Sequence, residues 1–294
     1  MGYKSGDVID DRYEILEKVG VGGHGTVYRA RDRELDGTVA VKVLHASFAR
    51  SSAFTKRMQR EARAMGKLAG TCAAQVMGFH KNPDGGAYLV MEYLVGEDLN
   101  QHLMNVERDG GRLPGGEVLD ILGPIASTLE AGHVRGVIHR DVKLGNIFLL
   151  RNRARGRVRL LDFGLVKDLK ASLITMPGTV PGSPAYIAPE AWRGNSDEIS
   201  HRVDVYAFGV VVFRVLAGTF PFAANRPIHE IIQEVTEQPR PSLAALRPDL
   251  DPRIDDWVQK ALAISPDERF QSIQSLWFVL KGLLNQTPEA ATEP

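Results

Sequence analysis

Three polar side chains whose types suit phosphoryl transfer follow one another in the segment His-Arg-Asp-Val-Lys-Leu-Gly-Asn. They are Asp141, Lys143 and Asn146. Apolar runs at 137–138 and 147–150 flank the segment, so the pattern predicts a loop between two strands. Taken alone, an Asp and an Asn at this spacing are as typical of turn chemistry as of catalysis.

A second carboxylate favours the catalytic interpretation. Asp162 follows another apolar run, in the sequence Leu-Asp-Phe-Gly. Oxygen ligands from two adjacent loops are what a divalent cation requires, so Asn146 and Asp162 are the predicted metal ligands.

The two segments resemble the HRDxKxxN and DFG motifs of the eukaryotic-type serine/threonine protein kinases, with a compact build like the bacterial members. The resemblance implies ATP as cosubstrate and Mg²⁺ as the metal at Asn146 and Asp162, for which Mn²⁺ can substitute. Asp141 would orient the acceptor hydroxyl and take its proton, and Lys143 would steady the γ-phosphate. The resemblance also assigns supporting roles to His139, Arg140, Phe163 and Gly164.

Composition limits the class of protein. The chain has 294 residues, 44% hydrophobic content, and 36 basic against 36 acidic residues, which is typical of a folded protein and argues against nucleic-acid binding. A single cysteine, Cys72, and no secretory pattern favour the cytoplasm. The most apolar helix-length stretch, 203–217, is short and contains two charges, so no membrane span is predicted.

A glycine-rich turn joins two predicted strands, 13–19 and 27–30, after a loosely held lead-in over 1–11. Glycines inside a hairpin suit a flap whose backbone N–H groups cover phosphates, although an ordinary glycine-rich hairpin would look the same. We expect His24 at the tip to be exposed. The resemblance assigns ATP contacts here to Val19, Gly20, Val21, Gly22, Gly25 and Val27.

Lys42 lies in an otherwise apolar predicted strand, 38–44, where an unpaired ammonium would be costly. Its candidate partners are the ATP phosphates and Glu61, on the predicted helix 51–69. The alternative is an edge-strand lysine that reaches water. Two more strands are expected near 75–79 and 87–91.

The segment after these strands resembles the hinge between kinase lobes. Met91 would be the gatekeeper, and backbone groups of Glu92 and Leu94 would face adenine. Further ATP contacts are assigned to Ala40 and Asp98. The expected divisions are an N-lobe over 12–94, a C-lobe over 95–286 and a flexible tail over 287–294.

Helical periodicity dominates the second part of the chain, so the predicted fold class is α+β, with a small antiparallel sheet lobe carrying one main helix and a larger, mostly helical lobe. The predicted helices are 98–106, 117–135, 203–217, 227–237, 252–263 and 273–284. Alternating arginines at 151–159 lack interleaved aromatic residues and are interpreted as a solvated hairpin. Asp204 resembles the aspartate that holds the catalytic-loop backbone, and Arg269 the partner of Glu190.

Residues 165–187 are rich in Ser, Thr, Gly and Pro, and resemble a kinase activation segment. We expect autophosphorylation first at Thr175 and next at Thr179, by self-association in trans, because the cation of Arg140 needs an anionic partner. Ser183 would stay unmodified and contact Asp141 and Lys143.

Protein substrates are expected, although Gly145 stands where many relatives carry a glutamate that binds a substrate arginine. Two alternatives remain. A pseudokinase scaffold would lack Lys42, Asp141 or Asp162, all of which are present. A small-molecule phosphotransferase would lack the docking segment Gly-Ser-Pro to Ala-Pro-Glu that occurs here.

Overall fold

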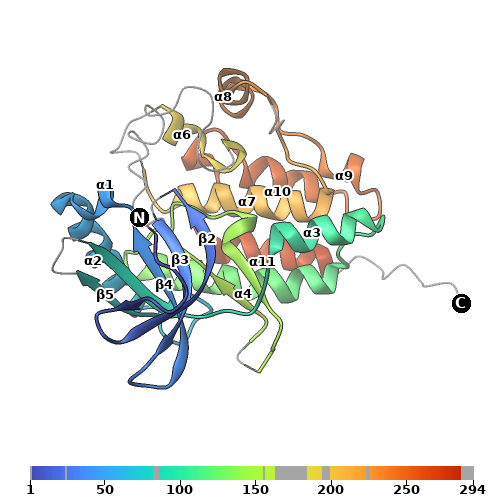
Figure 1. The fold of residues 1–294 in the computed structure, drawn as a ribbon. Coiled ribbons are helices and arrows are strands. Elements are labelled where there is room, and N and C mark those ends of the chain that lie inside the picture. The colour runs from blue at the N-terminus through green and yellow to red at the C-terminus, as the bar shows by residue number, and fades with distance from the viewer. Residues whose placement is uncertain are drawn as a thin grey trace, which may run out of the picture. The chain divides into compact units, whose positions relative to one another are not determined.

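The computed structural model describes residues 2–23, 25–81, 86–154, 156–162, 184–193, 199–222 and 226–285, without the side chains of Arg57 and Glu61. The chain forms two compact units, Met1–Gly96 and Glu97–Pro294 (Figure 1). Several predictions lie outside the described residues, namely those for His24, Phe163, Gly164, Thr175, Thr179, Ser183 and the tail.

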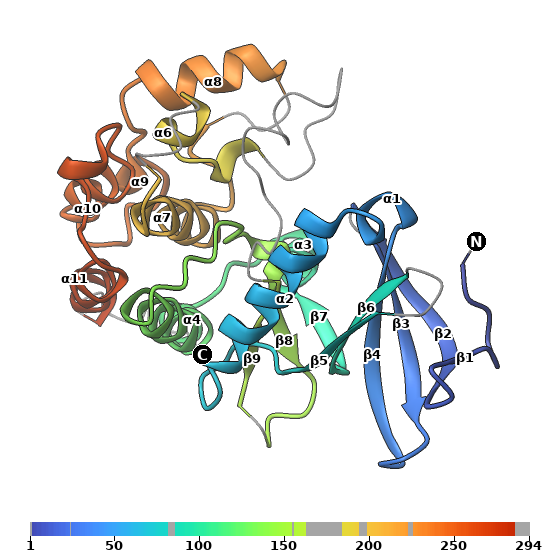
Figure 2. The same cartoon turned by 90° about the vertical axis from the view of Figure 1, so that its left-hand side faces the viewer.

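The first unit is built on a six-stranded antiparallel sheet with the strand order β1-β2-β3-β4-β6-β5. The strands are β1 (Val8–Ile9), β2 (Tyr13–Gly22), β3 (Gly25–Asp32), β4 (Gly37–Leu44), β5 (Val76–Lys81) and β6 (Ala87–Glu92). Two helices complete the unit, α1 (Ala46–Ala49) and α2 (Ser52–Gly66). Figure 2 shows α2 beside β5. Ser51 begins α2 as its N-cap, accepting from the Phe54 N–H at 3.3 Å.

The register separates two faces of this sheet. Residues paired directly across strands, or two apart along a strand, point to the same side. One side, the apolar face, carries a buried cluster of Ile9, Tyr13, Ile15, Tyr28, Ala30, Val39, Val41, Tyr88 and Val90. The other side, the lysine face, carries Val27, Ala40, Lys42, Leu89 and Met91. The cross-strand neighbours of Lys42 on this side, Val27 and Leu89, are therefore both apolar.

The lead-in is more ordered than the sequence predicts. β1 pairs with β2, and Ile9 is only 2% exposed because it covers part of the apolar face. The Gly6 N–H donates to the Ile15 carbonyl at 2.9 Å, and the Tyr3 N–H donates to the Tyr28 hydroxyl at 3.1 Å. The expectation of a loosely held segment over 1–11 was wrong, because long-range pairing compensates for a weak local pattern.

The second unit is mostly helical. Its α-helices are α3 (Leu99–Arg108), α4 (Gly115–Val134), α6 (Pro189–Trp192), α7 (Arg202–Ala217), α8 (Ile228–Glu237), α9 (Leu243–Leu246), α10 (Ile254–Ala261) and α11 (Ile273–Asn285). Short 3₁₀ helices are η1 (Leu144–Asn146), η2 (Pro184–Tyr186) and η4 (Pro266–Glu268). A three-stranded sheet consists of β7 (Gly96–Asp98), β8 (Ile147–Leu150) and β9 (Val158–Leu160). None of the helices in the described ranges is long and apolar enough to cross a membrane.

Helix α7 forms the centre of this unit. It packs against α4, α9, α10 and α11, and every residue from Val203 to Ala217 is buried (Figure 2). A helix that is apolar on all sides requires such surroundings. Gly209 permits the close approach of α10, because a Cβ there would lie 3.2 Å from the Ala261 Cβ. Gly218, at φ 75°, ends the helix in the left-handed conformation.

The hairpin of alternating arginines is partly anchored. Arg157 donates to the Glu117 carboxylate of α4 and lies 3.6 Å from Asp120. Arg151 and Arg153 are exposed. The hairpin is therefore attached through one arginine and solvated at others.

A buried ion pair joins α6 to the loop after η4. Arg269 donates to both oxygens of Glu190 at 2.7 and 2.6 Å, and the two side chains are 0% and 1% exposed. The remaining guanidinium hydrogens reach the carbonyls of Ala263, Arg202 and Ile264. The pair is fully hydrogen-bonded, which is the condition under which burial of two charges is tolerated.

Arg269→Met should reduce the free energy of unfolding by about 3–5 kcal/mol, because it leaves the Glu190 carboxylate buried without its counter-ion. Urea unfolding followed by circular dichroism measures the change. Arg253→Met is the matched control, since Arg253 pairs with Asp251 at the surface and its loss should leave the midpoint unchanged. Equal midpoints for the parent and both variants would contradict the role of the buried pair.

Candidate active site

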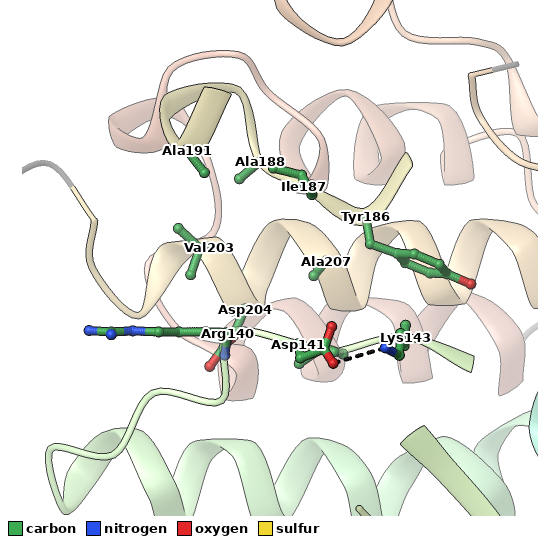
Figure 3. Close-up of a pocket in the computed structure, with 11 residues that line it drawn as sticks. Arg140, Asp141, Lys143, Tyr186, Ile187, Ala188, Ala191, Val203, Asp204 and Ala207 are labelled. Carbon is green, nitrogen blue, oxygen red and sulfur yellow. Dashed lines mark hydrogen bonds and ion pairs between the residues drawn. The ribbon is translucent and has the colours of Figure 1, made fainter. Parts of the chain in front are cut away.

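The catalytic loop gathers the three polar side chains on which the sequence argument rests. Lys143 Nζ lies 2.9 Å from Asp141 Oδ2 (Figure 3). Asn146 Nδ2 donates to the Asp141 backbone carbonyl at 2.7 Å and to Asp141 Oδ2 at 3.0 Å. One carboxylate is therefore fixed by an ammonium and an amide within a single short loop.

The loop is attached to α7 through Asp204. This carboxylate accepts the backbone N–H of His139 on Oδ2 and that of Arg140 on Oδ1, both at 2.7 Å. Burial acts to raise the pKa of Asp204, but the hydrogen bonds from His133 and from the His139 backbone N–H outweigh it, so the pKa lies below its ordinary value. Asp204 also lies in the first turn of α7, where the helix dipole favours an anion.

Two residues of the site adopt unusual backbone conformations. Arg140 has φ 62° and Asp162 has φ 34°, in the left-handed region that ordinary side chains rarely occupy. Such conformations persist only where the surroundings determine them, and they concentrate at functional sites. The bond from the Arg140 N–H to Asp204 is one such determinant.

His139 links the catalytic loop to the segment that carries Asp162. Its Nδ1 accepts the Asp141 N–H at 3.2 Å, and its Nε2 lies 3.0 Å from the Leu161 carbonyl. Because a carbonyl only accepts, Nε2 carries the proton and the ring is neutral. Burial lowers the pKa of His139, which keeps it in this form. The Leu161 N–H in turn donates to the Asn146 carbonyl at 2.8 Å, so Asn146 and Asp162 are brought together.

The donor set fits a cation that is held partly by a nucleotide. Both acceptors of the Asn146 Nδ2 are oxygens, which assigns the amide orientation and leaves Oδ1 as the atom that would ligate a cation. Among the described residues, no group of three or more His, Cys, Asp or Glu side chains could hold a metal alone. Mg²⁺ needs only one or two carboxylates beside phosphate oxygens and water, so Asn146 and Asp162 suffice.

A pocket lies beside Asp141, between the catalytic loop and α7 (Figure 3). Its wall includes Ile187 and Ala188, from the segment that the sequence analysis interprets as substrate-docking, and Val203 of α7. Tyr186 adjoins it and accepts the Leu144 N–H at 3.5 Å. Burial raises the pKa of Tyr186 to about 12, so the phenol stays neutral. The pocket wall is thus apolar apart from the Tyr186 hydroxyl and four charged residues, Arg140, Asp141, Lys143 and Asp204.

In the first unit, four of the predicted ATP-binding residues share the lysine face. Val27 pairs with Lys42 across strands, and Ala40 pairs with Met91. The glycine-rich hairpin closes where Gly22 pairs with Gly25. Gly25 has to be glycine, because a Cβ there would collide with the Val43 carbonyl. The hairpin also contains the predicted ATP contacts on β2, which are Val19, Gly20 and Val21. Both valines are exposed.

The predicted hinge residues follow β6. Glu92 exchanges hydrogen bonds with Gln75, whose N–H donates to Glu92 Oε1 at 2.8 Å. Asp98 caps α3 by accepting the Gln101 N–H at 3.0 Å, a structural role that the sequence interpretation omitted. Glu61 lies on α2, and its predicted pairing with Lys42 falls outside what the structure describes.

Two histidines that contact predicted site residues, one in each unit, were missed by sequence reasoning. His45 Nε2 donates to the Gly22 carbonyl at 3.1 Å and so holds the glycine-rich hairpin. His133 Nε2 lies 2.8 Å from Asp204 Oδ2. Neither belongs to a motif, and a lone histidine carries no signal until the fold shows its partner.

The similarity to known proteins agrees with this geometry. Residues 13–278 match the family model described as "Protein kinase domain". The crystal structure of the PknI kinase domain from Mycobacterium tuberculosis matches with a TM-score of 0.76 and 28% identity, covering 97% of this chain and all of that one. The chain therefore belongs to the protein kinase family, and the predicted α+β kinase fold class is confirmed.

The curated relatives are bacterial serine/threonine-protein kinases. PksC from Streptomyces coelicolor is 34% identical over 270 residues, which cover 90% of this chain and 48% of the relative. PknB from Mycolicibacterium smegmatis is 36% identical over 269 residues, which cover 90% of this chain and 41% of the relative. The chain thus spans about half the length of the curated relatives that it matches.

Asp204→Asn should lower the free energy of unfolding near pH 7 by about 2–3 kcal/mol, since an amide offers one acceptor oxygen in place of two. Because the folded pKa of Asp204 is lowered, its contribution is complete above the ordinary carboxyl pKa of about 4 and is lost as the pH falls below it. Urea titrations at pH 7, 5 and 3 measure the free energy of unfolding of the parent and of the variant. The difference between these two free energies should become smaller only below about pH 4. If the difference in free energy of unfolding stayed constant down to pH 3, the lowered pKa of Asp204 would be contradicted.

Proposed function

We propose that this chain transfers the γ-phosphoryl group of ATP to serine or threonine hydroxyls of proteins. The observation that carries the proposal is the arrangement around Asp141, with Lys143 Nζ at 2.9 Å and Asn146 Nδ2 at 3.0 Å from one carboxylate oxygen. Phosphoryl transfer needs little covalent help from a protein, and positioning with charge neutralisation provides most of the rate. The carboxylate of Asp141, the ammonium of Lys143 and the amide of Asn146, held in one loop, provide both positioning and charge neutralisation.

The catalytic roles follow from the charges of the side chains. Asp141 orients the acceptor hydroxyl and takes its proton as the hydroxyl oxygen bonds to phosphorus and the bond to the leaving ADP breaks. Lys143 places a positive charge beside the same carboxylate, where the γ-phosphate oxygens would lie. A lysine two residues after the aspartate is also the mark of serine and threonine specificity in the family that the chain resembles.

Asn146 and Asp162 are the proposed ligands of Mg²⁺, with Mn²⁺ as a substitute. Bound metal neutralises phosphate charge and holds the phosphates for in-line transfer. The protein's own contribution is the orientation of Asn146, whose amide nitrogen donates to two oxygens of Asp141, so that the amide oxygen would be the atom available to the metal.

The lysine face of the first unit is the proposed nucleotide surface. Lys42, paired with Glu61, would hold the α- and β-phosphates, and backbone groups of Glu92 and Leu94 would bind adenine. The other proposed contacts are Val19, Gly20, Val21, Gly22, Gly25, Val27, Ala40, Met91 and Asp98. In this assignment residues 12–94 form the N-lobe and 95–286 the C-lobe, of a kinase that acts on cytoplasmic proteins.

Purified protein with radiolabelled ATP and a generic protein acceptor tests the function. Transfer should require divalent metal, and Asp141→Asn should reduce it by about 10²–10⁴-fold while binding Mg-ATP with parental affinity. Asp162→Ala should instead bind the Mg-ATP complex poorly by calorimetry, because it removes a metal ligand. Asp109→Asn, 79% exposed and remote in sequence, is the charge-matched control.

Three outcomes would count against these assignments. Equal Mg-ATP affinities in the parent, Asp141→Asn and Asp162→Ala would contradict the division between catalytic and metal-binding roles. Label on small hydroxyl compounds but on no protein would favour a small-molecule phosphotransferase. Binding of Mg-ATP without transfer to any acceptor would favour a pseudokinase.

Autophosphorylation at Thr175, and next at Thr179, is proposed as the activating step. Arg140 supports it, because its guanidinium points away from the Asp141 carboxylate (Figure 3) and makes no hydrogen bond or ion pair within the described ranges. A phosphothreonine could pair with this cation through charge-assisted hydrogen bonds. Transfer in trans would require self-association of the chain.

Mass spectrometry of the parent and of Asp141→Asn, expressed identically, tests this step. Phosphate should appear on Thr175 or Thr179 in the parent and be absent from the inactive variant, whereas Ser183 should stay unmodified in both. A fully active parent with no phosphate between residues 165 and 187 would refute the activating role.

A further inference from the structure

Arg29 lies on the lysine face of the first unit, beside two of the proposed ATP contacts. It pairs across strands with Ala40, and Ala40 pairs with Met91, so the three side chains form one row on the same side of the sheet. Val27, two residues earlier on β3, lies on that side as well. No motif gives Arg29 a role, and yet its row ends on the strand from which the proposed hinge continues.

The guanidinium of Arg29 reaches the segment that follows β6. Its Cζ lies over the ring of Tyr93, 5.3 Å from the ring centre. A cation at this distance is attracted by the negative face of the aromatic ring. Tyr93 stands between Glu92 and Leu94, whose backbone groups are the proposed adenine contacts. The arginine thus holds the one side chain between the two adenine-facing positions.

Glu17 gives the guanidinium its direction. Arg29 Nη1 donates to Glu17 Oε1 at 3.1 Å, and the two side chains are 41% and 56% exposed, so the pair adds little stability by itself. Arg29 Nε is buried and makes no hydrogen bond with any residue in the described ranges. An apolar side chain would avoid that cost. What an arginine contributes here is therefore its position over the Tyr93 ring.

The contact restrains a segment that the sheet itself no longer orders. β6 ends at Glu92, and residues 93–95 have no regular secondary structure. A hydrogen bond from backbone to adenine requires the N–H and carbonyl groups to point in fixed directions. Rotation of this segment about its backbone would carry the Tyr93 ring away from the guanidinium. The pairing of ring and cation therefore favours one orientation of the neighbouring backbone groups.

We propose that Arg29 is a positioning residue for adenine binding. It holds the ring of Tyr93 and so orients the backbone of Glu92 and Leu94 toward the base. Arg29 touches neither the phosphates nor the acceptor protein in this scheme, so its loss weakens nucleotide binding and leaves the transfer step unchanged. The proposal rests on the proposed kinase function for the ATP site, but adenine binding can be measured without phosphoryl transfer.

Four variants test the proposal in the transfer assay. Arg29→Leu and Tyr93→Leu should each raise the KM for ATP by about two- to fivefold, the size of one exposed cation–π contact, with kcat unchanged. Tyr93→Phe keeps the ring face and should keep the parental KM. Arg31→Leu is the matched control, because Arg31 follows two residues later on the same strand and pairs with Asp36 at the surface.

Calorimetry with adenosine, which carries no phosphates, separates the proposal from the kinase assignment. The affinity for adenosine should fall by about two- to fivefold in Arg29→Leu and in Tyr93→Leu, and stay parental in Tyr93→Phe and Arg31→Leu. The double variant with leucine at both positions should lose no more than either single variant, because both changes remove the same contact.

The outcomes distinguish the two assignments. Parental adenosine affinity in Arg29→Leu, or losses that add up in the double variant, would overturn the role of the contact. A parent that binds adenosine but transfers no phosphoryl group would refute the kinase function, and the adenosine affinities of the variants would still decide the proposal. A parent that binds no adenosine would overturn the proposal itself.

Discussion

One buried carboxylate determines where the catalytic loop lies. Asp204 is removed from water, which is costly for an anion, and the cost is offset only because three N–H donors surround it. Each donor comes from 64 to 71 residues earlier in the chain. The charge can therefore be satisfied only in the folded unit, and the loop that satisfies it carries Asp141.

The rest of the second unit makes that arrangement rigid. The carboxylate lies on a helix that is buried from Val203 to Ala217 and packs so closely on α10 that a Cβ at Gly209 would lie only 3.2 Å from the Ala261 Cβ. Movement of this helix would disturb four neighbouring helices at once. Because α7 lies at the centre of the unit, its sequence is apolar. The same central position makes α7 a stable support for a strained loop.

Sequence reasoning succeeded where chemistry or periodicity is local. The spacing of Asp141, Lys143 and Asn146 in the HRDxKxxN segment predicted side chains that the structure places around one carboxylate. It failed where the partner is distant. β1 is too short to show alternation, and His133 becomes informative only once α4 lies against the start of α7. Asp98 shows a further limit, since one carboxylate can cap a helix and face a ligand, and composition cannot separate the two.

The pairing of β1 with β2 also affects how copies of this protein meet one another. Without β1, the ten residues of β2 would form a long open edge on which another chain could add a strand. β1 pairs with the start of β2, so the exposed edge of the sheet at this point is only two residues long. A tight turn with Asp10 and Asp11 at positive φ follows β1. At the opposite edge, β5 breaks its register between Val76 and Gly78 and ends in Lys81. Short edges, irregular register and charge all oppose edge-to-edge aggregation, so both edges of the sheet are protected.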